Sequence, residues 1–137
     1  MKDRSLSEEW LRRARSNMER AQAGKVSEGI LYEDLCFDCQ QVVEKSLKAL
    51  LVHIGVDFPW THSIAELIEL IEKTGIDIPE EIKDSVILTA YAVNTRYPGD
   101  YEFVDEEEYR EAVRIAERVY RWVGKKMKEL RKAEEGY

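Results

Sequence analysis

Apolar residues return at helical spacing along most of the chain, and the longest such run lies between Leu31 and Ile54. Successive apolar positions are three to five residues apart, and several of their neighbours are apolar too, which widens the stripe. A helix with so wide a stripe is buried on more than one side. The pattern therefore predicts a long central helix that ends at Gly55, a residue suited to a left-handed cap. The stripe comprises Leu35, Cys36, Cys39, Val42, Val43, Leu47, Leu50, Leu51 and Ile54.

Two shorter helices are marked by capping boxes, in which a serine hydroxyl and a glutamate three residues later satisfy free backbone amides. Ser5 and Glu8 predict the start of the first helix, and Ser63 and Glu66 predict the start of another that stops at Gly75. The apolar face expected for the first helix is Trp10, Ala14, Met18 and Ala21.

Two more helices follow from proline and acidic start signals. Asp77, with Pro79 in the first turn, predicts a helix that continues until Tyr97–Pro98, because the residue before a proline avoids helical geometry. Asp105 with Glu108 predicts the start of the last helix. The inward face expected for the helix after Asp77 is Ile82, Val86, Ala90 and Val93.

These elements together predict an all-α fold, an up-and-down antiparallel bundle of four to five helices, because no segment has the pattern of a strand and the connectors are short. With 137 residues and 44% hydrophobic content, the chain is expected to form a single domain. No run of apolar residues reaches the roughly 18 that a membrane span requires, and Met1–Ser7 is polar. We therefore expect a cytoplasmic protein without a membrane partner.

The charge balance of the chain is acidic, with a net charge of -7. This argues against a broad basic platform for nucleic acid and leaves room only for a local basic pocket. Charged residues make up 36% of the chain while Asn and Gln are scarce, a bias typical of hyperthermophile proteins.

Cys36 and Cys39 have a C-x2-C spacing but lie within the predicted central helix, without a second pair to complete a zinc site. We interpret them as small core residues, with a redox pair or a metal site as the alternative. No metal and no cofactor are expected.

The segment from Thr95 to Phe103 combines one arginine with three aromatic residues. The guanidinium of Arg96 matches phosphate geometry, the rings of Tyr97 and Tyr101 suit stacking on a base, and Gly99 lets backbone amides approach a ligand. The alternative is structural: Tyr97 and Phe103 close the end of the core, and Arg96 pairs with a neighbouring carboxylate.

His62 directly precedes the Ser63 cap, where the positive end of the helix dipole favours the neutral imidazole. Such a histidine can act as a general base, although a cap or a packed ring explains it equally. His53, in the apolar end of the central helix, is interpreted as structural.

Polar residues alternate with core positions along the central helix, and Glu44 and Lys48 form a favourable i,i+4 pair. This pattern is typical of a solvated face. A dimer seam or a pocket is the alternative if Gln41 and Lys45 point toward the Arg96 segment.

The stretch from Cys36 to Leu51, followed by Thr61–Ser63 and then by Arg96–Gly99, resembles HEPN domains in order and spacing. The resemblance covers about residues 6 to 130. It implies the four- to five-helix fold of this nucleotide-binding family, named for higher eukaryotes and prokaryotes, and a homodimer with a cleft between the subunits.

Many HEPN proteins are metal-independent ribonucleases with an Arg-x4-6-His motif. Here Arg96 is present, but the fifth residue after it is Tyr101 and no histidine follows. A tyrosine, with a pKa of about 10, is a poor base at neutral pH. On this branch the catalytic residues are Arg96, Tyr101 and His62, the last acting across the cleft.

Other HEPN proteins resemble partners of a minimal nucleotidyltransferase, in some cases as the toxin half of a toxin–antitoxin pair. This branch implies that Tyr101, or else Tyr97, accepts a nucleotidyl group. It is our leading expectation: a nucleotide- or RNA-binding protein whose ligand contacts Arg96, Tyr97, Gly99 and Lys45. A divergent ribonuclease and a non-catalytic dimeric interaction module are the alternatives.

Overall fold

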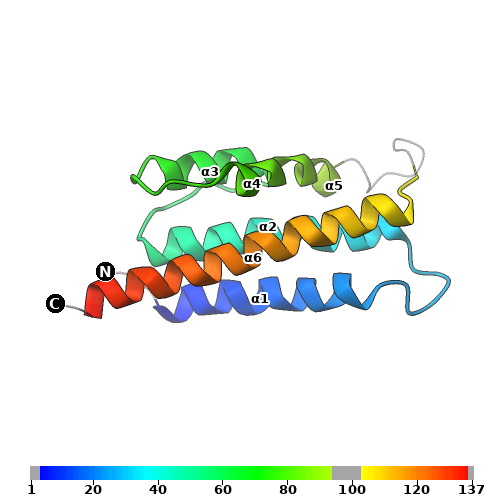
Figure 1. The fold of residues 1–137 in the computed structure, drawn as a ribbon, viewed down its shortest axis with the longest axis horizontal. Helices are drawn as coiled ribbons and strands as arrows, with labels where there is room; N and C mark the ends of the chain where they lie inside the picture. Colours follow the sequence, from blue (N-terminus) through cyan, green and yellow to red (C-terminus); the bar gives the residue numbers. More distant parts are fainter. Residues whose placement is uncertain (1–3, 94–102, 136–137) are drawn as a thin grey trace.

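The computed structural model of the chain describes residues 4–93 and 103–135, and the elements within these ranges are all helical (Figure 1). The expected all-α bundle is thereby confirmed. None of the described helices is long and apolar enough to cross a membrane. The elements are α1 (Arg4–Ala23), α2 (Tyr32–His53), α3 (Ile64–Glu72), α4 (Glu80–Lys83), the 3₁₀ helix η1 (Asp84–Thr89), α5 (Ala90–Val93) and α6 (Glu106–Glu135).

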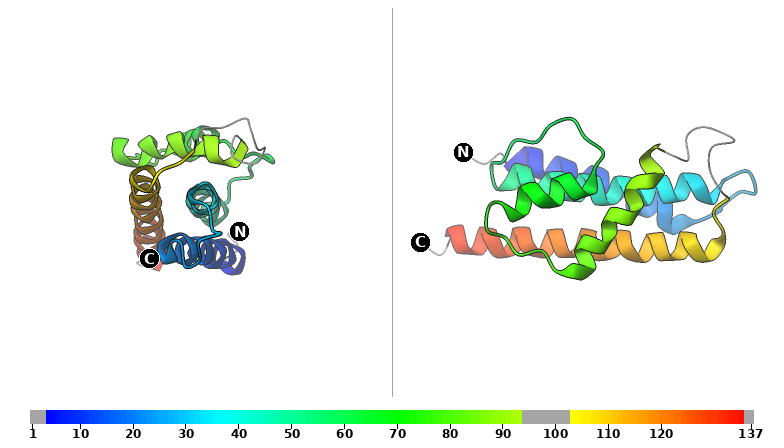
Figure 2. Two further views of the ribbon diagram at one scale, coloured as in Figure 1. Left: turned by 90° about the vertical axis from the view of Figure 1, so that its right-hand side faces the viewer. Right: turned by 90° about the horizontal axis from the view of Figure 1, so that it is seen from above.

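Helix α2 lies at the centre of the bundle, as its wide apolar stripe predicts. Three of its sides are covered, by α1, by α6 and by the layer formed from α3 to α5 (Figure 2). Among the residues that the structure describes, the fourth side carries only the loop from Ile54 to Ser63. We call this fourth side the open face of α2.

The core is built from the predicted apolar positions. Ala14, Met18 and Ala21 of α1 are buried against α2, and both cysteines are fully buried. Burial penalises the thiolate and raises the pKa of Cys36 to about 12, so this thiol is protonated at neutral pH. The interpretation of Cys36 and Cys39 as core residues is confirmed.

Local capping signals were accurate at two helix starts, and wrong at Ser5 and at Asp77, since α4 begins after Pro79 without a side-chain cap. The Ser63 hydroxyl accepts from the Glu66 amide at 3.2 Å, and an Asp105 carboxylate oxygen accepts from the Glu108 amide at 2.8 Å. Gly55 has a φ of 75°, the left-handed conformation expected after α2. Ser5, however, lies inside α1, which already includes Arg4.

The single helix expected after Asp77 is wrong, because this stretch is divided into α4, η1 and α5. In the 3₁₀ geometry of η1, Leu88 is buried with 2% exposure, while Val86, expected to face inward, is 41% exposed. Ser85 contributes a physical reason: its hydroxyl donates to the Ile82 carbonyl at 2.6 Å, an interaction that competes with α-helical pairing. The β-branched residues that follow also lower the α-helical propensity.

Candidate functional site

The open face of α2 presents side chains that recur every three or four residues along one line of the helix. Phe37, Gln41 and Lys45 are half-buried there. Helix α1 borders the open face on one side, and the Ile54–Ser63 loop follows the end of α2 on the other. Polar groups from all three segments meet on this face, which makes it the candidate functional site.

Glu44 is the centre of a buried polar network beside the open face, although it is only 4% exposed. Its carboxylate accepts hydrogen bonds from Lys48 at 2.8 Å, from Gln40 at 2.9 Å and from His62 Nδ1 at 2.9 Å. Gln41 extends the network by donating to the Gln40 side-chain oxygen at 2.7 Å. The expectation of a solvated face is therefore wrong for Gln40, Glu44 and Lys48.

The ionisation of Glu44 decides the tautomer of His62. Burial by itself raises the pKa of Glu44, but the hydrogen bonds from Lys48, Gln40 and His62 outweigh it and lower the pKa overall. An ionised carboxylate only accepts, so His62 Nδ1 must carry the proton. In a neutral imidazole this arrangement leaves Nε2 as the free acceptor, the form that a general base requires.

Three aromatic rings surround the ammonium group of Lys48. Its Nζ lies 5.4 Å from the ring centroid of Trp10, 5.5 Å from that of Phe58 and 5.8 Å from that of Trp60. These cation–π contacts attach the loop before α3 to the centre of α2. Trp60 also contacts His62 edge to face at 5.4 Å, yet it remains 87% exposed.

A second polar chain links α1 to the other edge of the open face. Lys45 Nζ donates to Asn17 Oδ1 at 2.7 Å, and Asn17 Nδ2 donates to Asp38 Oδ1 at 2.8 Å. Arg20 pairs with the same Asp38 oxygen at 3.2 Å. Burial lowers the pKa of Lys45, and the charges of Arg13 and Arg20 lower it further, whereas the carboxylates of Glu44 and Asp38 raise it.

The structure brings two of the expected site residues, His62 and Lys45, to the open face. Val104, just after the undescribed segment, donates its amide to Glu33 at 3.2 Å, near the start of α2. Glu33 and Glu44 are eleven residues apart, or about 16 Å along the helix axis. The remaining expected site residues lie outside the described residues: Arg96, Tyr97, Gly99 and Tyr101.

Two buried polar residues of this site were not singled out from the sequence: Asn17 and Asp38. Asn17 did carry a signal, because it lies three residues after Ala14 and thus on the core side of α1. Glu44 was noticed only as half of an i,i+4 pair, and the spacing does not reveal that the loop closes over it.

The comparison with protein families gives one decisive match. The model of the HEPN domain matches residues 7–129, which is most of the chain. The chain belongs to the HEPN family. HEPN is a nucleotide-binding family, so the resemblance drawn from the stretch between Cys36 and Leu51 is confirmed at the level of the family.

Two solved structures share this HEPN fold. One is described as an archaeal HEPN homologue, ST0689, with 29% identity and a TM-score of 0.71, and the other is TT1696 from Thermus thermophilus, with 30% identity and a TM-score of 0.73. Each alignment covers 88% of this chain and 97% of the other. The search of curated proteins gave no match.

Proposed function

We propose that this HEPN protein binds a nucleotide or RNA at the open face of α2 and acts together with a minimal nucleotidyltransferase. The observation that carries the proposal is the polar chain from Lys45 through Asn17 and Asp38 to Arg20, which places two basic side chains beside a half-buried surface. In a chain of net charge -7, Lys45 and Arg20 are cations that can attract a phosphate to this face. Partial burial of Lys45 strengthens such a contact, because the dielectric screening is weaker there.

In this proposal the Arg96 segment supplies the remaining ligand contacts. Arg96 binds phosphate through its fork, Tyr97 stacks on a base, and the Gly99 backbone approaches the ligand. The nucleotidyltransferase attaches a nucleotidyl group to the Tyr101 hydroxyl: the phenolic oxygen bonds to the α-phosphorus of a nucleoside triphosphate, pyrophosphate leaves, and the phenolic proton passes to solvent. Such a modification would neutralise the HEPN protein if it is the toxin half of a pair.

Calorimetric titration with ATP tests the binding step. We expect saturable binding by the wild type and at least tenfold weaker binding by Lys45→Ala and by Arg96→Ala. Lys73→Ala, which removes an exposed lysine at the end of α3, is the matched control and should bind as the wild type does. Equal affinity in wild type and Lys45→Ala would show that the open face is not the nucleotide site.

The transfer step has its own test, with a minimal nucleotidyltransferase and α-labelled ATP. Label should enter the wild-type chain and Tyr97→Phe, and should be absent from Tyr101→Phe. Labelling of Tyr101→Phe at the wild-type level would remove Tyr101 as the acceptor.

A divergent metal-independent ribonuclease is the second candidate, and the His62–Glu44 pair favours it. Glu44 holds the imidazole with Nε2 free to take a proton from a ribose 2′-hydroxyl. Incubation of labelled RNA in EDTA should then give cleavage that is lost in both His62→Ala and Arg96→Ala. Intact RNA after incubation with the wild-type protein would reject the ribonuclease and leave the binding proposal in place.

A further inference from the structure

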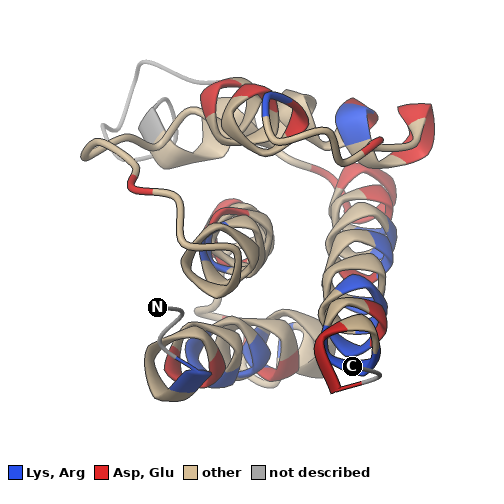
Figure 3. Cartoon of the chain, turned by 90° about the vertical axis from the view of Figure 1, so that its left-hand side faces the viewer, with Lys and Arg blue, Asp and Glu red and all other residues tan. Residues whose placement is uncertain are grey.

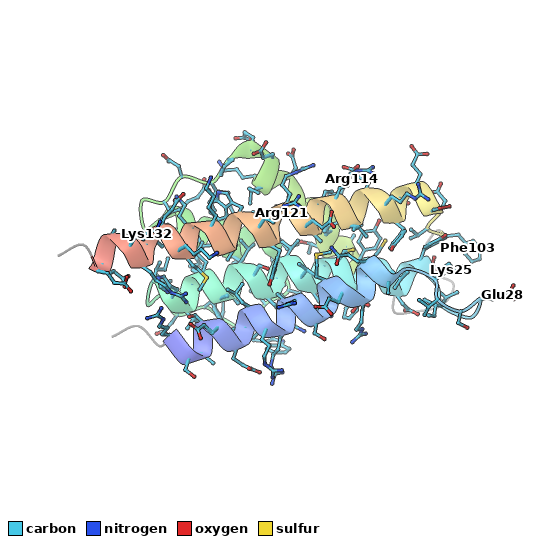
Figure 4. All side chains as sticks on the ribbon, turned by 60° about the horizontal axis from the view of Figure 1, so that its bottom comes forward. Lys25, Glu28, Phe103, Arg114, Arg121 and Lys132 are labelled. Carbon is cyan, nitrogen blue, oxygen red and sulfur yellow. The ribbon has the colours of Figure 1, made fainter. Side chains whose placement is uncertain are left out.

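Basic residues form a regular line on the outer surface of α6, on a different side of the molecule from the open face of α2. They are separated by steps of three, four, three and four residues, which keeps them on one side of a helix. That side is opposite the buried residues Val119 and Val123. Figure 4 shows Arg121 and Lys132 on this side of α6. We call the line the basic stripe; it consists of Arg118, Arg121, Lys125, Lys128 and Lys132.

The charges of the basic stripe are not neutralised within the described part of the chain. Closer to its start, α6 pairs its arginines, Arg110 with Glu106 at 2.7 Å and Arg114 with Glu111 at 2.6 Å. None of the five stripe residues makes an ion pair with a described residue.

Nearby carboxylates are engaged with other groups: Glu117 accepts from Gln22 at 2.7 Å, and Glu129 pairs with Lys126 at 3.2 Å. Acidic residues lie at both ends of α6 (Figure 3), and between Arg118 and Lys132 the helix has seven basic residues and one acidic residue, Glu129, so this part of the acidic chain is locally basic.

A hollow of about 460 Å³ lies between α1 and α6, along the edge of the basic stripe. Leu11, Tyr120 and Met127 give it an apolar floor, and its rim includes three stripe residues together with Arg131. The Nε of Arg131 is buried without a hydrogen-bond partner among the described residues, although its Nη2 pairs with Glu8 at 3.3 Å. A volume of this size accommodates a nucleobase with part of its sugar.

Gly124 lines the same hollow from the middle of α6. Glycine in a helix interior is unfavourable compared with alanine, so it usually has a packing reason. Here a Cβ at Gly124 would meet no atom within 4 Å, and packing within the described chain does not require the glycine. The missing side chain instead leaves room for a group that enters from outside.

We propose that the basic stripe binds the phosphates of single-stranded RNA and that the hollow at Gly124 receives one of its bases. Neighbouring stripe residues are about 4.5 to 6 Å apart along the axis, and the stripe spans about 21 Å, which suits several successive phosphates better than one nucleotide. Tyr120 offers an aromatic ring for stacking. This inference rests on the proposed RNA-binding function and adds a second surface to it.

Fluorescence anisotropy with a labelled twelve-residue oligouridylate tests the stripe. We expect the double variant Lys125→Ala/Lys128→Ala to bind at least tenfold more weakly than the wild type. The slope of log affinity against log salt should also fall by about 1.4, or about 0.7 for each lost phosphate contact. Lys25→Ala/Lys73→Ala removes the same charge elsewhere and should change the affinity by less than twofold.

The hollow is tested by filling it. Gly124→Leu should weaken RNA binding at least fivefold, while Gly124→Ala should bind as the wild type does. Both substitutions favour the helix, so their melting temperatures should equal or exceed that of the wild type, which separates a blocked hollow from a misfolded protein.

The outcomes separate this inference from the proposed function. Weaker RNA binding by the stripe variant, with ATP binding intact, supports the inference. If Lys45→Ala loses RNA binding and the stripe variant keeps it, the inference is wrong and the open face is the RNA site. If polyglutamate binds the basic stripe as tightly as RNA does, the stripe is a binding site for an acidic protein and the inference is wrong. A change of oligomeric state in Gly124→Leu, with RNA affinity unchanged, would assign the hollow to a second copy of the chain.

Discussion

At the scale of single residues, the interactions of Glu44 join three parts of the fold. It neutralises Lys48 within the aromatic surroundings of that side chain, and it fixes the ring of His62. Removal of this buried carboxylate has a large effect, because Lys48 and Gln40 lose their partner where both are buried.

Replacing Glu44 with Gln should therefore destabilise the protein strongly. We expect the free energy of unfolding to fall by about 3 kcal/mol, since the variant leaves the Lys48 ammonium buried without a counter-charge. Urea denaturation followed by circular dichroism measures the change.

The double variant Glu44→Gln/Lys48→Met serves as the control. It removes the unpaired charge and leaves a side chain that packs against the same three rings, so it should recover part of the loss. A double variant less stable than Glu44→Gln alone would contradict this explanation.

Two of the buried carboxylates of α2, Glu44 and Asp38, should have opposite effects on acid stability. The pKa of Glu44 is lowered, so its contribution is present above the unfolded value of about 4.3 and is lost as pH falls through the folded pKa. Burial raises the pKa of Asp38 despite contacts with Asn17 and Arg20, so its contribution is present below about 3.9 and is lost as pH rises through the folded pKa.

The loss of unfolding free energy between pH 7 and pH 3 should consequently be larger in Asp38→Asn than in the wild type. It should be smaller in Glu44→Gln. Urea titrations at both pH values give the two differences, and identical losses in all three proteins would refute the assignment.

Residue patterns predicted the core and two caps of this chain because those features depend on local spacing. Cys36, Ser63 and Asp105 each occupy the environment that their immediate neighbours imply. The polar site was less predictable. Whether Glu44 is solvated or enclosed depends on the loop bearing His62, which is eighteen residues away along the chain.

At the scale of elements, the segment between α3 and α6 departs from regular α-helix. The apolar residues of its sequence fit an α-helical period. However, η1 has about three residues per turn instead of 3.6, so different side chains face inward. Sequence periodicity alone does not distinguish these two geometries over so short a stretch. The 3₁₀ geometry makes Leu88 the buried residue of η1 and leaves Val86 near the surface.

Leu88→Ala and Val86→Ala form a matched pair that tests this register. Leu88→Ala should lower the free energy of unfolding by about 2 to 5 kcal/mol, the range for truncating a buried leucine. Val86→Ala, at a position with 41% exposure, should cost below about 1 kcal/mol. Thermal or urea unfolding distinguishes the two, and a larger loss for Val86→Ala would indicate a continuous α-helix instead.

At the scale of the whole molecule, the uncovered fourth side of α2 is where a second subunit is expected. HEPN domains often dimerise, and a homodimer placed there would form a cleft that contains the His62 and Lys45 side chains. The exposed ring of Trp60 lies at this surface, whereas Ile87, also exposed, lies on η1.

Sedimentation velocity should show a dimer for the wild-type chain and for Ile87→Asp. Trp60→Asp should sediment mainly as a monomer at the same concentration, because an uncompensated charge would enter the interface. A monomeric wild type, or equal association of both variants, would contradict a dimer through the open face.

The two fully buried cysteines have a practical consequence for measuring how often this bundle opens. A thiol-reactive dye modifies the thiolate, and in the folded chain both thiols are enclosed and protonated. Labelling therefore requires the surroundings of Cys36 and Cys39 on α2 to open first. When reclosing is faster than the dye reaction, the labelling rate gives the free energy of that opening under native conditions. The wild-type protein thus carries its own reporter of core dynamics, and no engineered probe is needed.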